Sequence, residues 1–199
     1  MPAIGVLLEA VEAKDPGARA HSISVANLSA AFGQRMALSS SAIRNLRVAA
    51  LLHDIGKIGI PDAILTKRGP LTLKEFEIIK THPAIGVRIL RQGGAFRELS
   101  PIILHHHERF DGLGYPGRLK QQQIPMGSRI LCVADAIETM SAARTYKQPF
   151  GTDRIRSELI AGAGHQFDPE VVDVALEWLD ETRPPRSPTD DRAPLRAAS

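Results

Sequence analysis

The sequence predicts an all-α fold with a single helical bundle domain, and three observations support this. Apolar residues recur at the three- and four-residue spacing of helices along almost the whole chain. No segment shows the alternating, β-branched pattern of paired strands. With 199 residues and 43% hydrophobic composition, the chain is long enough for one sizeable core and short for two. We therefore expect one domain over residues 1–181.

Two helices are predicted in the first part of the chain. Helical spacing places the first over residues 23–32, with an end near Gly33, and the second over residues 43–51. The second helix runs directly into His53 and Asp54. A turn should follow, because three residues that interrupt helices come next, namely Gly56, Gly59 and Pro61.

The middle of the chain is predicted to place a histidine at a joint between two helices. Residues 72–75 form a capping-box pattern that opens a helix through Ile79. Pro83 should end or kink that helix directly after His82 and can start the next one, which continues to Leu90.

Three helices and a loop are predicted for the rest of the domain. Residues 100–101 start the helix that leads into a run of histidines. Residues 109–125 are rich in glycine, glutamine and proline and predict an ordered surface loop. Helical spacing returns over residues 129–140, which include Asp135, and a capped last helix covers residues 168–178.

Residues 182–199 differ from the rest in composition. They carry four prolines, four arginines and two aspartates and little that a core could bury. This composition is typical of a disordered segment, and we predict a Pro/Arg-rich tail. The tail contributes +2 of the formal net charge of +3, so a broad nucleic-acid-binding surface is not expected on the domain, whereas a local basic pocket for a phosphorylated small molecule is compatible with it.

Cysteine content and hydropathy predict a cytoplasmic location. The single cysteine, Cys132, excludes an internal disulfide and suits a reducing compartment. No apolar run approaches the length of a membrane span, and no basic residue precedes the apolar stretch at the start of the chain. We therefore expect neither a membrane helix nor a signal peptide.

Nitrogen and oxygen donors gather in a pattern that predicts a two-metal site. His53 and Asp54 are adjacent, so on a helix their side chains diverge by about 100° and the carboxylate can reach between two ions. Further donors lie near predicted helix ends or on other helices, namely His82, His106, His107 and Asp135. Imidazole and carboxylate ligands suit iron, manganese or zinc, and two such ions can activate water for phosphodiester hydrolysis. For any one histidine alone, an ordinary polar residue is the favoured interpretation, and we apply it to His105 and His165.

Two stretches carry a resemblance to a known family. The first runs from His53 to Pro61, and the second runs from His106 to Pro116 and ends in Gly-Tyr-Pro. Together they resemble the HD-GYP family of bacterial cyclic di-GMP phosphodiesterases, and the similarity extends from about residue 21 to residue 172. The resemblance implies a single HD-type helical bundle with a long ordered GYP loop. It also implies hydrolysis of cyclic di-GMP to pGpG, and it leaves open both further cleavage to GMP and a signalling protein partner at the GYP loop.

The resemblance implies roles for particular residues as well. It implies two divalent ions, iron or manganese, held by His21, His53, Asp54, His82, His106, His107 and Asp135. Asp54 would bridge the ions and orient the attacking hydroxide, and Lys57 would either stabilise charge on the scissile phosphate or assist the leaving group. Tyr115 would line the substrate cleft or a partner surface. Arg144 and Lys147 would hold the phosphates of the ligand.

The sequence departs from the family pattern at several positions. Some members carry a glutamate one turn before the first-helix histidine, and it supplies a third metal. Gly17 occupies that position here, so we expect two ions. Arg118 and Gln121 replace usual glycines of the loop, and Glu138 replaces a second aspartate of the later helix. None of these changes removes an implied ligand, but they can alter loop shape, substrate fit or a partner contact.

Three functions therefore stay open. The first is a cyclic di-GMP phosphodiesterase, which the full set of implied ligands favours. The second is an HD-type phosphohydrolase for another nucleotide. The third is a catalytically weak or inactive module that acts by binding a ligand or a protein partner. The loop substitutions support the third function, whereas the intact group of His53, Asp54 and Lys57 argues against it. The sequence leaves open whether the chain forms a homodimer.

Overall fold

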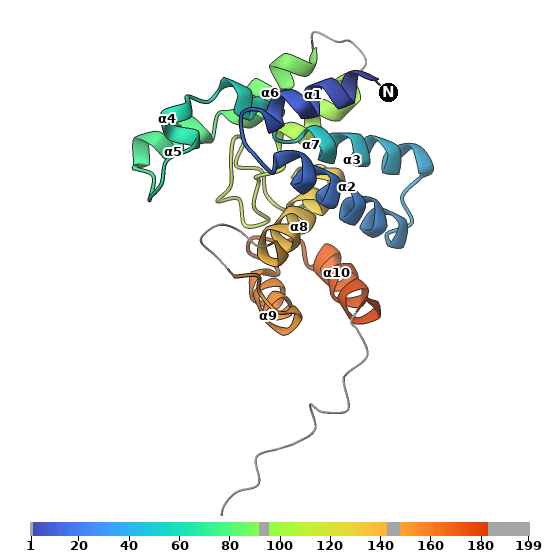
Figure 1. The fold of residues 1–199 in the computed structure, drawn as a ribbon. Helices are drawn as coiled ribbons and strands as arrows, with labels where there is room; N and C mark the ends of the chain where they lie inside the picture. Colours follow the sequence, from blue (N-terminus) through green and yellow to red (C-terminus); the bar gives the residue numbers. More distant parts are fainter. Residues whose placement is uncertain (1, 92–95, 143–147, 183–199) are drawn as a thin grey trace, which may run out of the picture.

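The computed structural model describes residues 2–91, 96–142 and 148–182, and these form the predicted all-α fold without a strand (Figure 1). The helices are α1 (Pro2–Glu12), α2 (Ala18–Arg35), α3 (Ser40–Leu52), α4 (Asp62–Leu65), α5 (Leu73–Ile79), α6 (His82–Arg91), α7 (Ser100–Leu104), α8 (Met126–Ser141), α9 (Thr152–Gly162) and α10 (Pro169–Glu181). Short 3-10 turns cover Ile55–Gly59 (η1), Arg97–Leu99 (η2) and Gln121–Gln123 (η3). None of the described helices is both long enough and apolar enough to cross a membrane.

Helix α3 lies between two hydrophobic clusters. On one side its residues join a cluster with residues of α2, α8, α9 and α10, including Val25, Leu46 and Ile130. On the other side it packs with α1, η1, α6 and α7 through residues such as Leu52 and Ile103. Burial of two faces fixes the direction of α3, and its C-terminal end therefore carries the next residues into a defined place between the two clusters.

Capping side chains start several helices where the sequence indicates. Ser39 accepts a hydrogen bond from the Ala42 amide at 3.2 Å, before α3. The predicted capping box at Thr72 and Glu75 is present at the start of α5. Asp168 accepts from the Glu170 amide at 3.0 Å and begins α10. Each cap satisfies an amide that the first turn of a helix leaves without a partner.

Two predicted helix boundaries are wrong by a few residues. Helix α2 continues past Gly33 to Arg35, because this glycine is a close-packing position against the side chains of Ile43 and Leu46 rather than a helix end. The joint before α6 falls at Lys80 and Thr81, so that His82 opens α6 instead of ending α5. Sequence reasoning also missed three helices, namely α1, α4 and α9.

The segment from α4 to α5 stands out from the bundle, whereas the GYP loop is ordered without an α-helix. Neither α4 nor α5 has a buried residue, and both project to one side in Figure 1. Residues 105–125 contain only the short turn η3, which agrees with the predicted loop. Of the sequence-based expectations, the phosphate contacts of Arg144 and Lys147 and the tail predicted over residues 182–199, except Thr182, lie outside the described residues.

Candidate metal centre

Three histidines lie just beyond the C-terminal ends of three helices. His53 directly follows α3, His82 lies three residues beyond α5 and is also the first residue of α6, and His106 lies two residues beyond α7. The last carbonyls of a helix lack an amide partner four residues further on, so they are free to accept other donors. In each case the ring Nδ1 donates to the carbonyl three residues earlier, namely His53 to Ala50 at 2.8 Å, His82 to Ile79 at 2.8 Å and His106 to Ile103 at 2.7 Å. In the neutral ring this bond places the proton on Nδ1 and leaves the lone pair of Nε2 directed at the centre.

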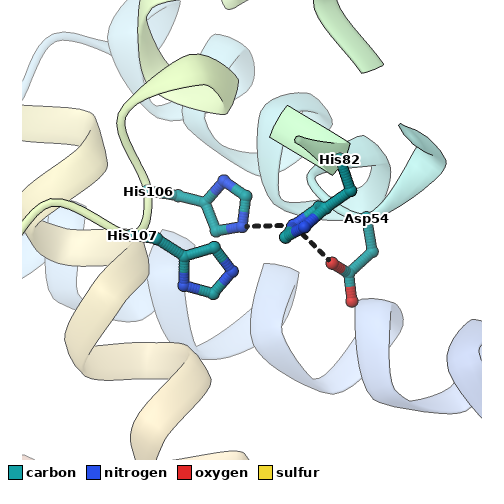
Figure 2. A group of neighbouring side chains, drawn as sticks. All are labelled: Asp54, His82, His106 and His107. Carbon is teal, nitrogen blue, oxygen red and sulfur yellow. Dashed lines mark hydrogen bonds and ion pairs between the residues drawn. The ribbon is translucent and has the colours of Figure 1, made fainter. Parts of the chain in front are cut away.

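The first group of donors contains Asp54, His82, His106 and His107 (Figure 2). The Oδ1 atom of Asp54 lies 3.3 Å from His82 Nε2, which lies 3.4 Å from His106 Nε2. Because Nδ1 carries the proton in both rings, two Nε2 lone pairs and a carboxylate oxygen face one another. Such an arrangement is repulsive by itself and fits a cation between the donors.

The second group contains His21, His53 and Asp54, with Asp135 beside it. The Oδ2 atom of Asp54 lies 3.3 Å from His53 Nε2, and Oδ1 of Asp135 lies 3.2 Å from His21 Nε2. Asp54 thus belongs to both groups and offers a different oxygen to each. The adjacency of His53 and Asp54 produces this arrangement, because neighbouring side chains at a helix end point in different directions.

The charges around Asp54 keep it ionised. Burial opposes ionisation, but His53 in its protonated form and Lys57 hold the pKa of the Asp54 carboxyl well below its usual range. Lys57 Nζ lies 2.8 Å from Oδ2 of Asp54 and 3.1 Å from Oδ2 of Asp15. Burial opposes its charge as well, yet these two carboxylates raise the pKa of Lys57. The centre therefore contains a fixed negative charge with a cationic side chain directly beside it.

The histidines differ in their preferred charge. Burial and the neighbouring imidazoles lower the pKa of His107 to about 4 and hold the pKa of His106 well below its usual range. Both rings are then neutral near pH 7, which is the form that binds a metal. Burial opposes protonation of His21 as well, but Asp135 and Glu138 raise its pKa to about 9. These carboxylates concentrate negative charge around His21, which favours a cation at this position.

A cavity of about 630 Å³ opens onto the two donor groups. Its polar lining includes Asp15, His21, Asp54, Lys57, His82, His107, Tyr115, Asp135 and Glu138. Tyr115 forms one wall and stacks on His107, with ring centroids 4.9 Å apart. Phe76 of α5 also contacts Tyr115, with the two rings nearly perpendicular and their centroids 6.4 Å apart. The volume lies in the range of pockets that enclose small-molecule ligands.

The buried carboxylate of Glu108 holds the GYP loop in this position. It accepts hydrogen bonds from the amides of Gly117 at 2.5 Å and Leu119 at 3.2 Å. Gly114 packs against the backbone of the same segment, since a Cβ atom there would lie 2.3 Å from the Arg109 nitrogen. The loop therefore presents Tyr115 on a backbone that is fixed at both sides.

Arg118 and Gln121 occupy strained positions in this loop. Their φ angles are 52° and 49°, in the left-handed region where side chains are disfavoured by about 1–2 kcal/mol. The glycines expected from the family pattern would relieve this strain. We therefore predict that Arg118→Gly and Gln121→Gly each raise the free energy of unfolding by about 0.5–1 kcal/mol, after the greater entropy of glycine in the unfolded chain is subtracted. Urea denaturation of each variant measures this, and equal or lower stability would contradict it.

The structure brings the implied metal ligands together beside the cavity, and Lys57 and Tyr115 line it. Their roles as ligands and catalytic groups stay predictions. His165 is exposed, and His105 contacts Glu108 at 3.4 Å, as expected for histidines outside the centre.

Sequence reasoning missed three carboxylates, namely Asp15 beside Lys57, Glu108 beneath the loop and Glu138 beside His21. Only Glu138 had a usable signal, because a residue three positions after Asp135 shares its helix face.

Comparison with known proteins gives consistent relatives. A family model described as "HD domain" matches residues 5–171. The chain is 42% identical over 172 residues to a "Cyclic di-GMP phosphodiesterase" of Thermotoga maritima, which covers 85% of this chain and 47% of that protein. It is 38% identical over 177 residues to a "3'3'-cGAMP-specific phosphodiesterase 2" of Vibrio cholerae, and this alignment covers 88% of this chain and 34% of that protein. The chain thus spans less than half the length of these two curated relatives.

A solved structure shows the same fold. Bd1817, an HDG"Y"P protein from Bdellovibrio bacteriovorus, superposes with a TM-score of 0.66 and covers 82% of this chain and 52% of that chain. The sequences are 20% identical, so this likeness supports the helical architecture and not a shared activity.

Proposed function

This chain belongs to the HD domain family, as its HD-GYP resemblance indicates, and from that premise we propose that it is a metal-dependent phosphodiesterase that hydrolyses cyclic di-GMP to pGpG. One observation carries the proposal. Asp54 directs its two oxygens at two separate groups of nitrogen donors on the wall of a ligand-sized cavity. A carboxylate shared in this way suits a pair of divalent ions.

The proposed centre holds two ions, iron or manganese. His82, His106 and His107 would bind one ion together with Oδ1 of Asp54. The other ion would be bound by Oδ2 of Asp54 together with His21, His53 and Asp135. When bound, the ions would supply the positive charge that activates water and stabilises the phosphodiester in the transition state. A third ion is not proposed, because Gly17 offers no side-chain donor.

Residues at the cavity wall would position the substrate. Lys57 Nζ projects from η1 beside Asp54 and would donate to a phosphate oxygen as charge develops there. Tyr115 would provide a flat apolar surface for a base, since its ring already stacks on His107 and is fixed by the loop. Arg144 and Lys147 stay proposed phosphate contacts from the family resemblance.

The direct test is anaerobic incubation of manganese- or iron-loaded protein with cyclic di-GMP and chromatographic separation of the products. Wild-type protein is expected to produce pGpG, and GMP if the second ester is cleaved. Lys57→Met is expected to keep both ions, because Lys57 is not a ligand, and to lower turnover by about 10²–10³-fold through loss of one charge-stabilising donor.

Lys14→Met is a matched control, since Lys14 pairs with Asp62 outside the cavity lining. Equal turnover by Lys57→Met and Lys14→Met would contradict the proposed role of Lys57. No turnover by wild-type protein with confirmed metal would contradict the proposed activity and favour a module that acts by binding a ligand or a signalling protein at the GYP loop.

A second substrate has specific support. The relative from Vibrio cholerae that is named for 3'3'-cGAMP is 38% identical to this chain. The same incubation with 3'3'-cGAMP separates the two substrates, and a higher kcat/KM for 3'3'-cGAMP would change the assignment while the metal centre stays as proposed. Predictions of a disordered tail, a homodimer, a signalling partner and a cytoplasmic location remain predictions.

A further inference from the structure

His21 is held differently from the other histidines of the centre. His53, His82 and His106 follow helix ends, where free backbone carbonyls accept their Nδ1–H groups. His21 is the fourth residue of α2, and carbonyls inside a helix already accept from the amides four residues further on. His21 therefore needs an acceptor from another part of the chain to fix its ring.

Glu138 of α8 supplies this acceptor. Its Oε2 atom contacts Nδ1 of His21 directly, and the two side chains are 12% and 14% exposed. Asp135 lies one turn earlier on the same helix and places Oδ1 3.2 Å from Nε2 of His21. Among the described residues these two carboxylates thus divide the two ring nitrogens between them.

The division has a chemical consequence. When the ring is neutral, as metal binding requires, a proton on Nδ1 that is donated to Glu138 leaves the lone pair on Nε2 beside the Asp135 oxygen. Two ligand atoms that each lie about 2.0–2.2 Å from one ion are about 3–3.5 Å apart, and the Nε2 to Oδ1 distance of 3.2 Å falls in this range. If the proton were on Nε2, the ring could not bind an ion through that atom.

We propose that Glu138 is a positioning residue for His21: it holds the tautomer and ring orientation that present Nε2 to the ion shared with Asp135. This inference rests on the proposed metal-dependent function. The acceptor for His21 is a charged carboxylate, whereas the acceptors for the other three histidines are neutral backbone carbonyls. Glu138 therefore also makes the His21 imidazole a stronger electron-pair donor to a metal ion. The ion on the His21 side should then depend on Glu138, whereas the ion on the His82, His106 and His107 side should not.

The test is anaerobic equilibrium binding of Mn²⁺, measured on metal-free protein that has been loaded stepwise. Wild-type protein should bind two ions. Glu138→Ala removes both the acceptor and the charge. It should weaken the binding of one ion about 100-fold and leave the affinity for the other ion unchanged. Glu138→Gln keeps an acceptor oxygen and should weaken the binding of the same ion less, about tenfold. Glu177→Ala makes the same change at an exposed site on α10 and should bind as wild type.

Melting of the metal-free variants separates positioning from folding. A Glu138→Ala variant that melts at the same temperature as wild-type protein and loses one ion supports the proposal. If this variant is unstable, weaker binding of that one ion by Glu138→Gln supports the proposal instead. Binding of two ions at wild-type affinity by the folded Glu138 variants would overturn this inference but not the proposed metal centre. Equally weakened binding of both ions would also overturn this inference. Wild-type protein that binds no Mn²⁺ would overturn the proposed metal centre and this inference with it.

Discussion

Replacement of Asp54 by alanine is expected to abolish turnover and to reduce the binding of both ions together. Its two oxygens face different donor groups, Oδ2 toward His53 and Oδ1 toward His82, each at 3.3 Å. Removal of the carboxylate would also leave Lys57 without one of its two acidic partners. No other single side chain among the described residues belongs to both donor groups, so replacement of any other donor there should affect one ion only.

Metal content and turnover measure this prediction. Asp54→Ala should hold less than one ion per chain at concentrations where wild-type protein holds two, and its product formation should fall by more than about 10³-fold. Asp62→Ala is the matched control, because Asp62 is exposed and pairs with Lys14. Near wild-type turnover by Asp54→Ala would remove Asp54 from the proposed chemistry, and loss of a single ion would show that it does not bridge.

Gly56→Ala is expected to have the largest effect on stability. A Cβ atom at this position would lie 1.8 Å from the carbonyl oxygen of His82 and 2.6 Å from the nitrogen of Gly86. Both contacts are with the backbone of α6, which cannot move aside like a flexible side chain. The η1 turn and α6 would have to separate, and this separation would disturb Asp54 and His82 at once. We expect a loss of about 3 kcal/mol or more in the free energy of unfolding.

Thermal unfolding of metal-free protein tests this prediction. For a domain of this size a loss of about 3 kcal/mol corresponds to a fall in melting temperature of about 6–12 °C. Gly5→Ala is the matched control, since Gly5 lies in α1, a Cβ atom there would meet nothing within 4 Å, and alanine favours a helix. A Gly56→Ala variant that melts within about 2 °C of wild type would show that the close approach of η1 to α6 is not required.

Local features of the fold and of the centre were predictable from the sequence. Helical spacing and the caps at Thr72 and Asp168 identify helices correctly, because these signals act over a few residues. The adjacency of His53 and Asp54 predicts that one carboxylate can serve two groups, and the structure has this geometry. Both predictions depend on the geometry of a single helix or helix end.

Contacts between distant segments were not predictable in this way. Glu138 is 117 residues from His21, and Asp15 is 42 residues from Lys57. Spacing indicates that Glu138 shares a face with Asp135, but not which helix that face meets. Gly33 was misassigned for a similar reason, since a glycine that admits a neighbouring helix looks the same in sequence as one that ends a helix.

A crystal structure of the manganese-loaded protein, with anomalous diffraction data that locate the ions, tests the shared carboxylate most directly. Two anomalous peaks are expected on the cavity wall, one beside each oxygen of Asp54. One peak should lie near His82, His106 and His107, and the other should lie near His21, His53 and Asp135. A single peak at full manganese occupancy, or two peaks of which only one contacts Asp54, would contradict the shared carboxylate on which the proposed function rests.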